Sequence, residues 1–267
     1  MEPIERPTPT EADERWAQML LDNPRGRRNR RFHRRIPSPP RCRLCAAPFG
    51  IPGGLVMPIL GHGRWSKNPK YCAGCFRMLE RNHGGAEIAC SLLFADVRGS
   101  TRLAERMSPR EFNRLMGRFH DMAFDVLVDH DAFVDKFVGD EIIGIFVPAM
   151  AGASHGHKAI EAARDLLRRT SGTDPSKPWM PIGIGVSTGV AYVGSVGQGP
   201  DTNLTAMGDL VNTTARLASA AAAGEVLVMV SSETRDLLDG LERRTLALKG
   251  KSTPTEVAVI TSTGKER

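Results

Sequence analysis

The chain has 267 residues, of which 41% are hydrophobic and 25% are charged, a composition typical of a globular protein with one main domain and a smaller appendage. No apolar run reaches the roughly 18 residues that a membrane-spanning helix needs. The first residues, MEPIERPTPTEADERW, lack the basic and apolar regions of a secretory signal, so we expect a cytoplasmic protein.

The N-terminal part begins with a predicted helix and continues into an arginine-rich segment. EADERWAQMLLDNPRG has apolar residues at helical spacing, and we expect the Pro-Arg-Gly run to end this helix. Residues 25–43 then hold nine arginines and no acidic residue. Such a segment can bind nucleic acid or an anionic surface, but basic arms are more often solvated. We therefore expect residues 1–41 to form a largely disordered arm, without nucleic acid binding.

Four of the five cysteines form two Cys-x-x-Cys pairs, namely Cys42 with Cys45 and Cys72 with Cys75. Two such pairs offer four soft ligands to a tetrahedral metal ion. The segment between them is rich in glycine and proline and has too few hydrophobic core residues to fold without a cross-link such as a bound metal ion. We expect residues 42–85 to be a structural zinc module, and an iron–sulfur cluster with the same ligands remains the alternative.

Three further residues near this module carry weaker signals. His62 and His83 are spare ligand candidates, although isolated histidines near glycines are more often loop residues. Cys90 lies in an apolar run and is interpreted as a small buried hydrophobic residue.

Residues 86–262 alternate between strand and helix patterns and are expected to form one domain with both element types, followed by a tail over 263–267. Ser108 is the predicted N-cap of a long helix that has Pro109 in its first turn. The other predicted elements are a buried strand over 88–96, a hairpin over 132–147, a helix over about 157–169, a strand over 182–197, a helix over 208–222, and strands over 225–231, 242–250 and 255–261.

Two aspartates stand at the ends of predicted strands. Asp96 ends the first strand, and Asp140 lies in the Val-Gly-Asp turn of the hairpin. Aspartate also favours turns for its own backbone hydrogen bonds. A pair of carboxylates at adjacent strand ends, however, favours a site for Mg²⁺ or Mn²⁺, which take oxygen ligands.

Four segments carry a resemblance to a known family: FADVRGST, KFVGDEIIG, TAMGDLVNTTARL and LKGK, in this order. Over residues 87–260 the chain resembles the class III nucleotide cyclases, the adenylate and guanylate cyclase family. The resemblance implies an α+β, ferredoxin-like fold with an antiparallel or mixed sheet. It also implies that Asp96 and Asp140, helped by the main-chain carbonyl of Val97, hold two Mg²⁺ or Mn²⁺ ions per site.

The resemblance also implies roles for residues that contact the substrate. Asn212 would orient the ribose, and Arg216 would stabilise the α-phosphoryl group during transfer. The two are spaced i, i+4 and share one face of a helix that Asp209 is expected to cap. Lys249 would bind the triphosphate. The loop GQGPDTNLT lacks the arginine that many family members use there, so Lys249 or Arg98 is the candidate replacement.

Lys136 and Thr205 match the base-reading positions of the family. Lysine only donates hydrogen bonds, and a threonine hydroxyl can accept one, which complements the N1 acceptor and the 6-amino donor of adenine. Guanine presents the reverse pattern. We therefore expect ATP as the substrate, with a guanylate or dual-specificity cyclase as the alternative.

Family sites lie between two subunits, so the resemblance implies a homodimer with two equivalent sites. The expected function is that of an adenylate cyclase, converting ATP to 3′,5′-cyclic AMP and pyrophosphate for intracellular signalling. A hypothesis from a different class is a catalytically weak, nucleotide-sensing regulator whose zinc module binds nucleic acid.

Overall fold

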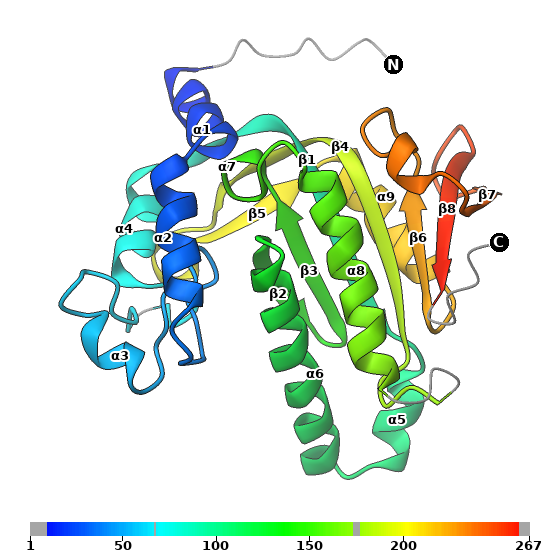
Figure 1. Cartoon of the computed structure of the whole chain (residues 1–267), viewed down its shortest axis with the longest axis horizontal. Helices are drawn as coiled ribbons and strands as arrows, with labels where there is room; N and C mark the ends of the chain where they lie inside the picture. Colours follow the sequence, from blue (N-terminus) through cyan, green and yellow to red (C-terminus); the bar gives the residue numbers. More distant parts are fainter. Residues whose placement is uncertain (1–9, 67, 173–176, 262–267) are drawn as a thin grey trace. The chain divides into compact units, whose positions relative to one another are not determined.

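The computed structural model describes residues 10–66, 68–172 and 177–261 (Figure 1). The chain divides into two compact units, one formed by the residues up to 88 with 192–206, the other by 89–191 with the residues from 207 onward. Two long strands, β1 (Gly84–Val97) and β4 (Ile182–Val196), contribute residues to both units. None of the helices in the described ranges is long and apolar enough to span a bilayer.

The first unit begins with two helices where one was expected. α1 (Glu11–Leu21) starts with a capping box between Thr10 and Asp13, and its amphipathic character is confirmed by buried apolar side chains on one face. α1 ends at Leu21, shortly before the Pro-Arg-Gly run, as expected, but that run does not begin a loop. Pro24 instead occupies the first turn of α2 (Pro24–Arg34), whose N-cap is Asn23.

The arginine-rich segment differs from the solvated arm that we expected, because α2 is anchored by two buried side chains. Arg30 is only 1% exposed, and its Nη1 donates a hydrogen bond of 2.5 Å to the carbonyl of Leu44. His33 is also buried, with Nδ1 2.9 Å from the carbonyl oxygen of Cys45. Composition alone does not reveal these tertiary partners. Residues 1–9 lie outside the described part of the chain.

The rest of the first unit packs the cysteine segment on a hairpin. It contains α3 (Gly53–Val56), α4 (Ala73–Arg81), the short 3-10 helix Gly199–Asp201 and β5 (Asn203–Met207), which pairs with β4. Tyr71 is buried and accepts a hydrogen bond of 3.3 Å from the backbone N–H of Leu204. The Ser195 hydroxyl donates to the carbonyl of Leu79 at 3.2 Å. β5 was not predicted, because its first residues continue the glycine- and proline-containing run GQGPDTNLT, which is typical of a loop.

The second unit is built on a sheet that is mixed, as the family resemblance implied. Over the described residues, the strand order is β2-β3-β1-β4-β6-β8-β7. β4 and β6 run parallel, whereas β1 with β3, β2 with β3, β6 with β8 and β7 with β8 are antiparallel. The strands not yet bounded are β2 (Phe133–Val138), β3 (Glu141–Phe146), β6 (Glu225–Met229), β7 (Glu242–Leu246) and β8 (Thr255–Thr261).

The predicted N-cap of the long helix is confirmed, since Ser108 forms a capping box with Glu111. The expected cap of α9 is wrong: Gly208 is the N-cap, and Asp209 is the first helical residue, whose carboxylate pairs with Lys251 instead. The helices of this unit are α5 (Ser100–Arg106), α6 (Pro109–Asp129), α7 (Pro148–Ala151), α8 (His155–Ser171), α9 (Asp209–Ala220) and the 3-10 helix Arg235–Leu238.

Helices α8 and α9 lie on opposite faces of the sheet, as two neighbouring residues of β4 demonstrate. The Ser187 hydroxyl bonds to that of Thr214 on α9. The Thr188 hydroxyl is 2.7 Å from Ser91 Oγ, which in turn is 2.9 Å from Nδ1 of His155 on α8. Successive side chains of a strand point to opposite faces.

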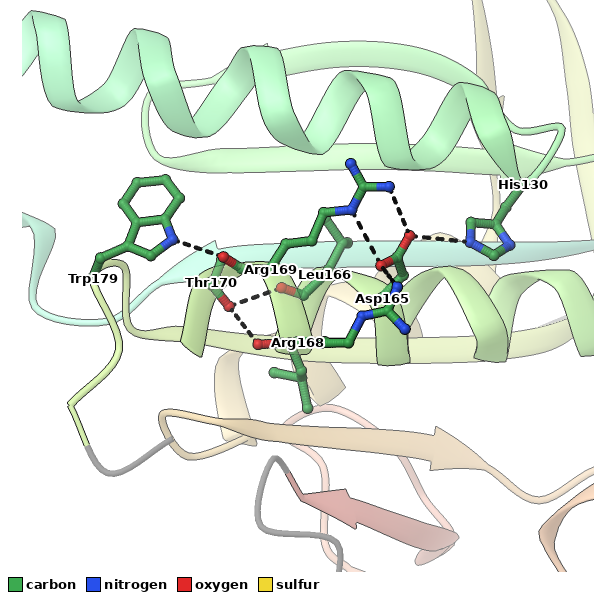
Figure 2. Close-up of polar contacts among 8 residues, drawn as sticks. His130, Asp165, Leu166, Arg168, Arg169, Thr170 and Trp179 are labelled. Carbon is green, nitrogen blue, oxygen red and sulfur yellow. Dashed lines mark hydrogen bonds and ion pairs between the residues drawn. The ribbon is translucent and has the colours of Figure 1, made fainter. Parts of the chain in front are cut away.

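Asp165 on α8 organises a charged cluster beside the core (Figure 2). Its carboxylate side chain is 10% exposed and accepts hydrogen bonds from Arg168 at 2.5 Å and from Arg169 at 3.2 Å, with His130 Nε2 at 3.5 Å. Burial raises the pKa of Asp165, but the two arginines outweigh this effect and hold the pKa below its ordinary value. The charged form is therefore the one that stabilises the fold.

We expect Asp165→Asn to lower the free energy of unfolding at pH 7 by about 1–3 kcal/mol, because it removes a charge from buried hydrogen bonds. A depressed pKa contributes stability above the unfolded-state pKa and loses it as the pH falls through the folded-state pKa. Urea unfolding curves of the two proteins should therefore converge in acid. The control is Glu161→Gln, whose ion pair with Arg164 at 3.8 Å is about 40% exposed and should contribute less than about 0.5 kcal/mol. If Asp165→Asn were as stable as the wild type at pH 7, the stabilising role of the charged Asp165 would be contradicted.

Candidate active site and cysteine cluster

The structure brings Asp96 and Asp140 together at one end of the sheet. β1 ends with Val97, whose N–H donates a hydrogen bond of 3.2 Å to the carbonyl of Asp140, and Asp96 stands opposite Glu141 in the pairing of β1 with β3. Burial raises the pKa of Asp96 above its ordinary value; the Arg98 cation opposes this shift, and the Asp140 charge adds to it. Each carboxylate thus lies in the field of the other. Paired oxygen ligands of this kind fit a hard divalent cation.

Arg98 contacts one carboxylate of this pair. Its Nη1 lies 2.6 Å from Oδ2 of Asp96, and its Nη2 donates to the carbonyl of Ala218 in the last turns of α9. A Cβ at Gly183 would lie 2.4 Å from the same Nη2, so only glycine leaves space for the guanidinium. Arg98 therefore links the end of β1 to α9.

α9 presents Asn212 and Arg216 on the side that faces away from the sheet. Leu210, Thr214 and Leu217, spaced at helical intervals, are buried against the strands. Asn212 is exposed and Arg216 half-buried, one turn apart. The i, i+4 face expected from the sequence is therefore present and is accessible to a ligand.

The loop that follows β7 runs along the same side of α9. Gly250 has a left-handed φ of 75°, and a Cβ there would lie 3.1 Å from Nη2 of Arg216. Lys249, the preceding residue, has an exposed side chain. Lys251 forms its ion pair with Asp209 at the start of α9. The loop thus places the backbone next to Lys249 against the Arg216 guanidinium, in a cationic segment suited to phosphate.

The two residues expected to contact the base belong to different units of the chain. Lys136 lies on β2 in the second unit, and its side chain is outside the described part of the structure. Thr205 is half-buried on β5 in the first unit. Base reading by these residues stays a prediction.

The four cysteines Cys42, Cys45, Cys72 and Cys75 meet in the first unit, with their ligand atoms within 4.8 Å of one another. Cys45 Sγ lies 3.7 Å from Cys72 Sγ. The backbone N–H of Cys72 donates to Cys42 Sγ at 3.3 Å, and that of Cys75 donates to Cys72 Sγ at 3.4 Å. Amide donors of this kind stabilise thiolate ligands of a metal. The cluster is compatible with the small metal module that the spacing predicted.

The pKa values of these thiols are set by burial and by their contacts with one another. Burial raises the pKa of Cys42, but hydrogen bonds from the other three cysteines outweigh it and leave the pKa well below its ordinary value. The hydrogen bonds and the charge of Cys42 contribute to raising the pKa of Cys45 and of Cys75 well above theirs. Four neighbouring thiolates repel one another, and a bound divalent ion offsets that repulsion.

Of the two spare histidines, His62 lies at the cluster and His83 is exposed. Nδ1 of His62 is 3.4 Å from Cys72 Sγ, and burial lowers the pKa of His62, which favours the neutral ring. Cys90 is fully buried, and burial raises the pKa of its thiol to about 12, which confirms its interpretation as a hydrophobic residue.

We expect the double variant Cys72→Ser, Cys75→Ser to lose its bound metal and to unfold the cysteine segment, because glycine- and proline-rich chain cannot offset its ordering entropy without a metal ligand set. Metal analysis of the wild type should give about one zinc ion per chain. The matched control, Cys90→Ala, should keep that metal content. Finding neither zinc nor iron, with four freely reactive thiols in the native protein, would contradict this prediction.

Two glycines that leave room for arginine side chains of the site were not predicted from the sequence. Gly183 and Gly250 matter because a guanidinium approaches each one closely. Glycine in a strand or loop signals such an approach only in general. The pairing of Lys251 with Asp209 likewise joins residues distant in the sequence, and no local pattern indicates it.

The comparison with known families gives the class of the domain that carries these features. The model of the adenylate and guanylate cyclase catalytic domain matches residues 86–261. The chain belongs to this family.

Solved structures similar to this chain include a guanylyl cyclase and an adenylyl cyclase. The guanylyl cyclase Cya2 is 25% identical to this chain with a TM-score of 0.59, and the match covers 66% of this chain and 93% of Cya2. The adenylyl cyclase CyaB from P. aeruginosa is also 25% identical, with a TM-score of 0.58, covering 67% of this chain and 96% of CyaB.

Curated relatives are longer proteins. Adenylate cyclase 1 of Rhizobium meliloti is 26% identical over 196 residues, which are 67% of this chain and 29% of the relative. The uncharacterized protein Rv1319c of Mycobacterium tuberculosis is 29% identical over 184 residues, 67% of this chain and 34% of the relative. The chain thus spans about a third of the length of these relatives.

Proposed function

We propose that the protein is a cytoplasmic adenylate cyclase that converts ATP to 3′,5′-cyclic AMP and pyrophosphate as an intracellular signal. The observation that carries this proposal is the meeting of Asp96 and Asp140 at the end of β1, where the backbone of Val97 is bonded to Asp140. A regulator without catalysis would not need this carboxylate pair. The Adenylate cyclase 1 relative and the likeness to CyaB add support.

Different residues of the site would bind the metal ions, the ribose and the α-phosphoryl group. Asp96 and Asp140, with the carbonyl of Val97, would hold two Mg²⁺ or Mn²⁺ ions. When bound, these ions lower the pKa of the ribose 3′-hydroxyl and balance the charge of the triphosphate. Asn212 orients the ribose, and Arg216 donates to the α-phosphoryl oxygens, where negative charge develops.

Binding of the triphosphate falls to the cationic segment beside α9. Lys249 is exposed next to Gly250, which lies against Arg216. Arg98 is the weaker candidate for this role, since its guanidinium is engaged by Asp96 and Ala218. Lys249 thus replaces the triphosphate arginine that the loop before β5 lacks.

We propose a homodimer in which each site uses residues of both subunits. Asn212 and Arg216 face away from their own sheet, so a second subunit can approach them. Two-fold symmetry would then build two equivalent sites from one chain type. The cysteine cluster would hold a structural Zn²⁺, for which four sulfur ligands within 4.8 Å of one another are suited.

The proposal is tested by incubating the purified full-length protein with ATP or GTP and with Mn²⁺ or Mg²⁺, and separating the products by chromatography. Cyclic AMP and pyrophosphate from ATP are expected, since Lys136 and Thr205 complement adenine. Cyclic GMP formed from GTP at a higher rate would make GTP the preferred substrate. Equal rates with the two nucleotides would indicate a dual-specificity cyclase. No cyclic product from either nucleotide would favour the regulator.

A further inference from the structure

The cysteine module exposes a cluster of aliphatic side chains that neither catalysis nor metal binding uses. We name it the aliphatic tip; its residues and exposed fractions are Ile51 79%, Leu55 67%, Val56 52%, Ile59 85% and Leu60 55%. They make up five of the eleven large apolar residues exposed in the described ranges. Single exposed apolar residues are ordinary, but a contiguous group marks an interaction site.

The tip is held by a fixed backbone. Met57, in the middle of the segment, is 1% exposed and points into the module. Its carbonyl accepts a hydrogen bond of 2.8 Å from the N–H of His62, and the N–H of Gly53 donates to Ser38 Oγ at 3.0 Å. The aliphatic side chains therefore remain outside although the segment folds around a buried residue.

The segment that carries the tip belongs to a strongly basic stretch of the sequence. Residues 23–79 contain thirteen lysines and arginines and no aspartate or glutamate. A Zn²⁺ ion with four thiolates carries a net charge of about −2, so the module stays strongly cationic with the metal bound. Four arginines on or next to α2 have exposed side chains, namely Arg25, Arg28, Arg31 and Arg35.

The C-terminal end of the basic helix lies next to both ends of the segment that carries the tip. Ile36, just after α2, approaches Gly53 at the start of α3 so closely that a Cβ there would lie 2.8 Å from its side chain. The rings of His33 and His62 are 4.9 Å apart. Phe32, 54% exposed on α2, adds an aromatic side chain to this region. Figure 1 draws α2 in blue, next to the lighter blue segment that carries α3.

We propose that the aliphatic tip inserts into the interface of an anionic membrane while the arginines of α2 bind the lipid headgroups. Membrane interfaces bind apolar side chains and basic groups together. Nucleic acid offers phosphates but no partner for five aliphatic side chains. A second copy of the module is a poor partner, since two surfaces without acidic residues repel each other. This binding site is separate from the proposed catalytic one.

The test is flotation of the full-length protein with vesicles of phosphatidylcholine alone or mixed with phosphatidylglycerol. Binding is expected only with the anionic vesicles and should weaken as salt is added. Ile59→Ser with Leu60→Ser should reduce the vesicle affinity at least about tenfold through lost apolar insertion. Arg28→Gln with Arg31→Gln should reduce it about thirtyfold, because each basic residue near an anionic surface contributes about fivefold.

Matched controls separate the site from general surface effects. Leu237→Ser changes an apolar residue that is 39% exposed in the second unit, and Arg110→Gln with Arg114→Gln removes two exposed arginines of α6. Both controls should bind vesicles as the wild type does, and all variants should keep their metal content and melting temperature. Absence of binding to anionic vesicles overturns the proposal. So does tight binding to DNA or RNA with none to vesicles, or a tip variant that changes only the oligomeric state.

Discussion

Replacing Asp96 or Asp140 by asparagine is expected to reduce cyclisation at least about a thousandfold, because each variant removes a charged ligand from the proposed two-metal site. The fold should survive. Asp96 makes an ion pair with Arg98 in which both side chains are about 25% exposed, and such pairs contribute about 1 kcal/mol or less. The measurement is the rate of cyclic nucleotide formation under saturating Mn²⁺, with the melting temperature and dimer mass recorded for each variant.

Asp239→Asn is the matched control for these two substitutions. Asp239 is exposed at the end of the 3-10 helix that follows β6, and it belongs to no proposed site. Its variant should keep the activity of the wild type. A near-normal rate for Asp96→Asn or Asp140→Asn would exclude the two-metal assignment, whichever purine the enzyme prefers.

The second large effect is expected from mixing two inactive variants, Asp96→Asn and Arg216→Ala. If the aspartates of one subunit serve a site with Arg216 of the other, a mixed dimer has one intact site and one doubly damaged site. Random exchange in an equal mixture then restores about a quarter of the sites of the wild type. Activity is measured after subunit exchange, which is followed independently with differently labelled chains.

A mixture of Asp96→Asn with Asp140→Asn provides the control for this experiment. Both aspartates come from the same subunit of each site, so every site in the mixed dimer lacks one of them and activity should stay absent. Rescue in this control, or no rescue in the first mixture despite proven exchange, would contradict a site shared between subunits.

The parts of the fold that could be predicted from the sequence follow local patterns. The apolar run before Asp96 forms the end of β1, and the Val-Gly-Asp turn joins β2 to β3 as expected. Antiparallel pairing of β1 with β3 then brings the turn beside the strand end, so the two aspartates meet. The i, i+4 spacing of Asn212 and Arg216 likewise needed only helical geometry.

The parts that could not be predicted depend on partners far away in the sequence. An arginine-rich segment looks solvated until the carbonyl of Leu44 provides an acceptor for Arg30. β5 looks like a loop until its backbone pairs with β4. The sequence predicts Asp209 as a helix cap, but its carboxylate forms an ion pair with Lys251. In each case a tertiary contact overrides the local preference.

The bonds from α2 to the first cysteine pair make the basic helix and the cysteine cluster parts of one cooperative unit. Arg30 and His33 bond to the carbonyls of Leu44 and Cys45, which lie within the first Cys-x-x-Cys pair. Opening of the cluster would remove both acceptors and let α2 fray. The backbone at the six arginines of α2 would then become accessible to trypsin, so resistance to trypsin reports the state of the cluster directly.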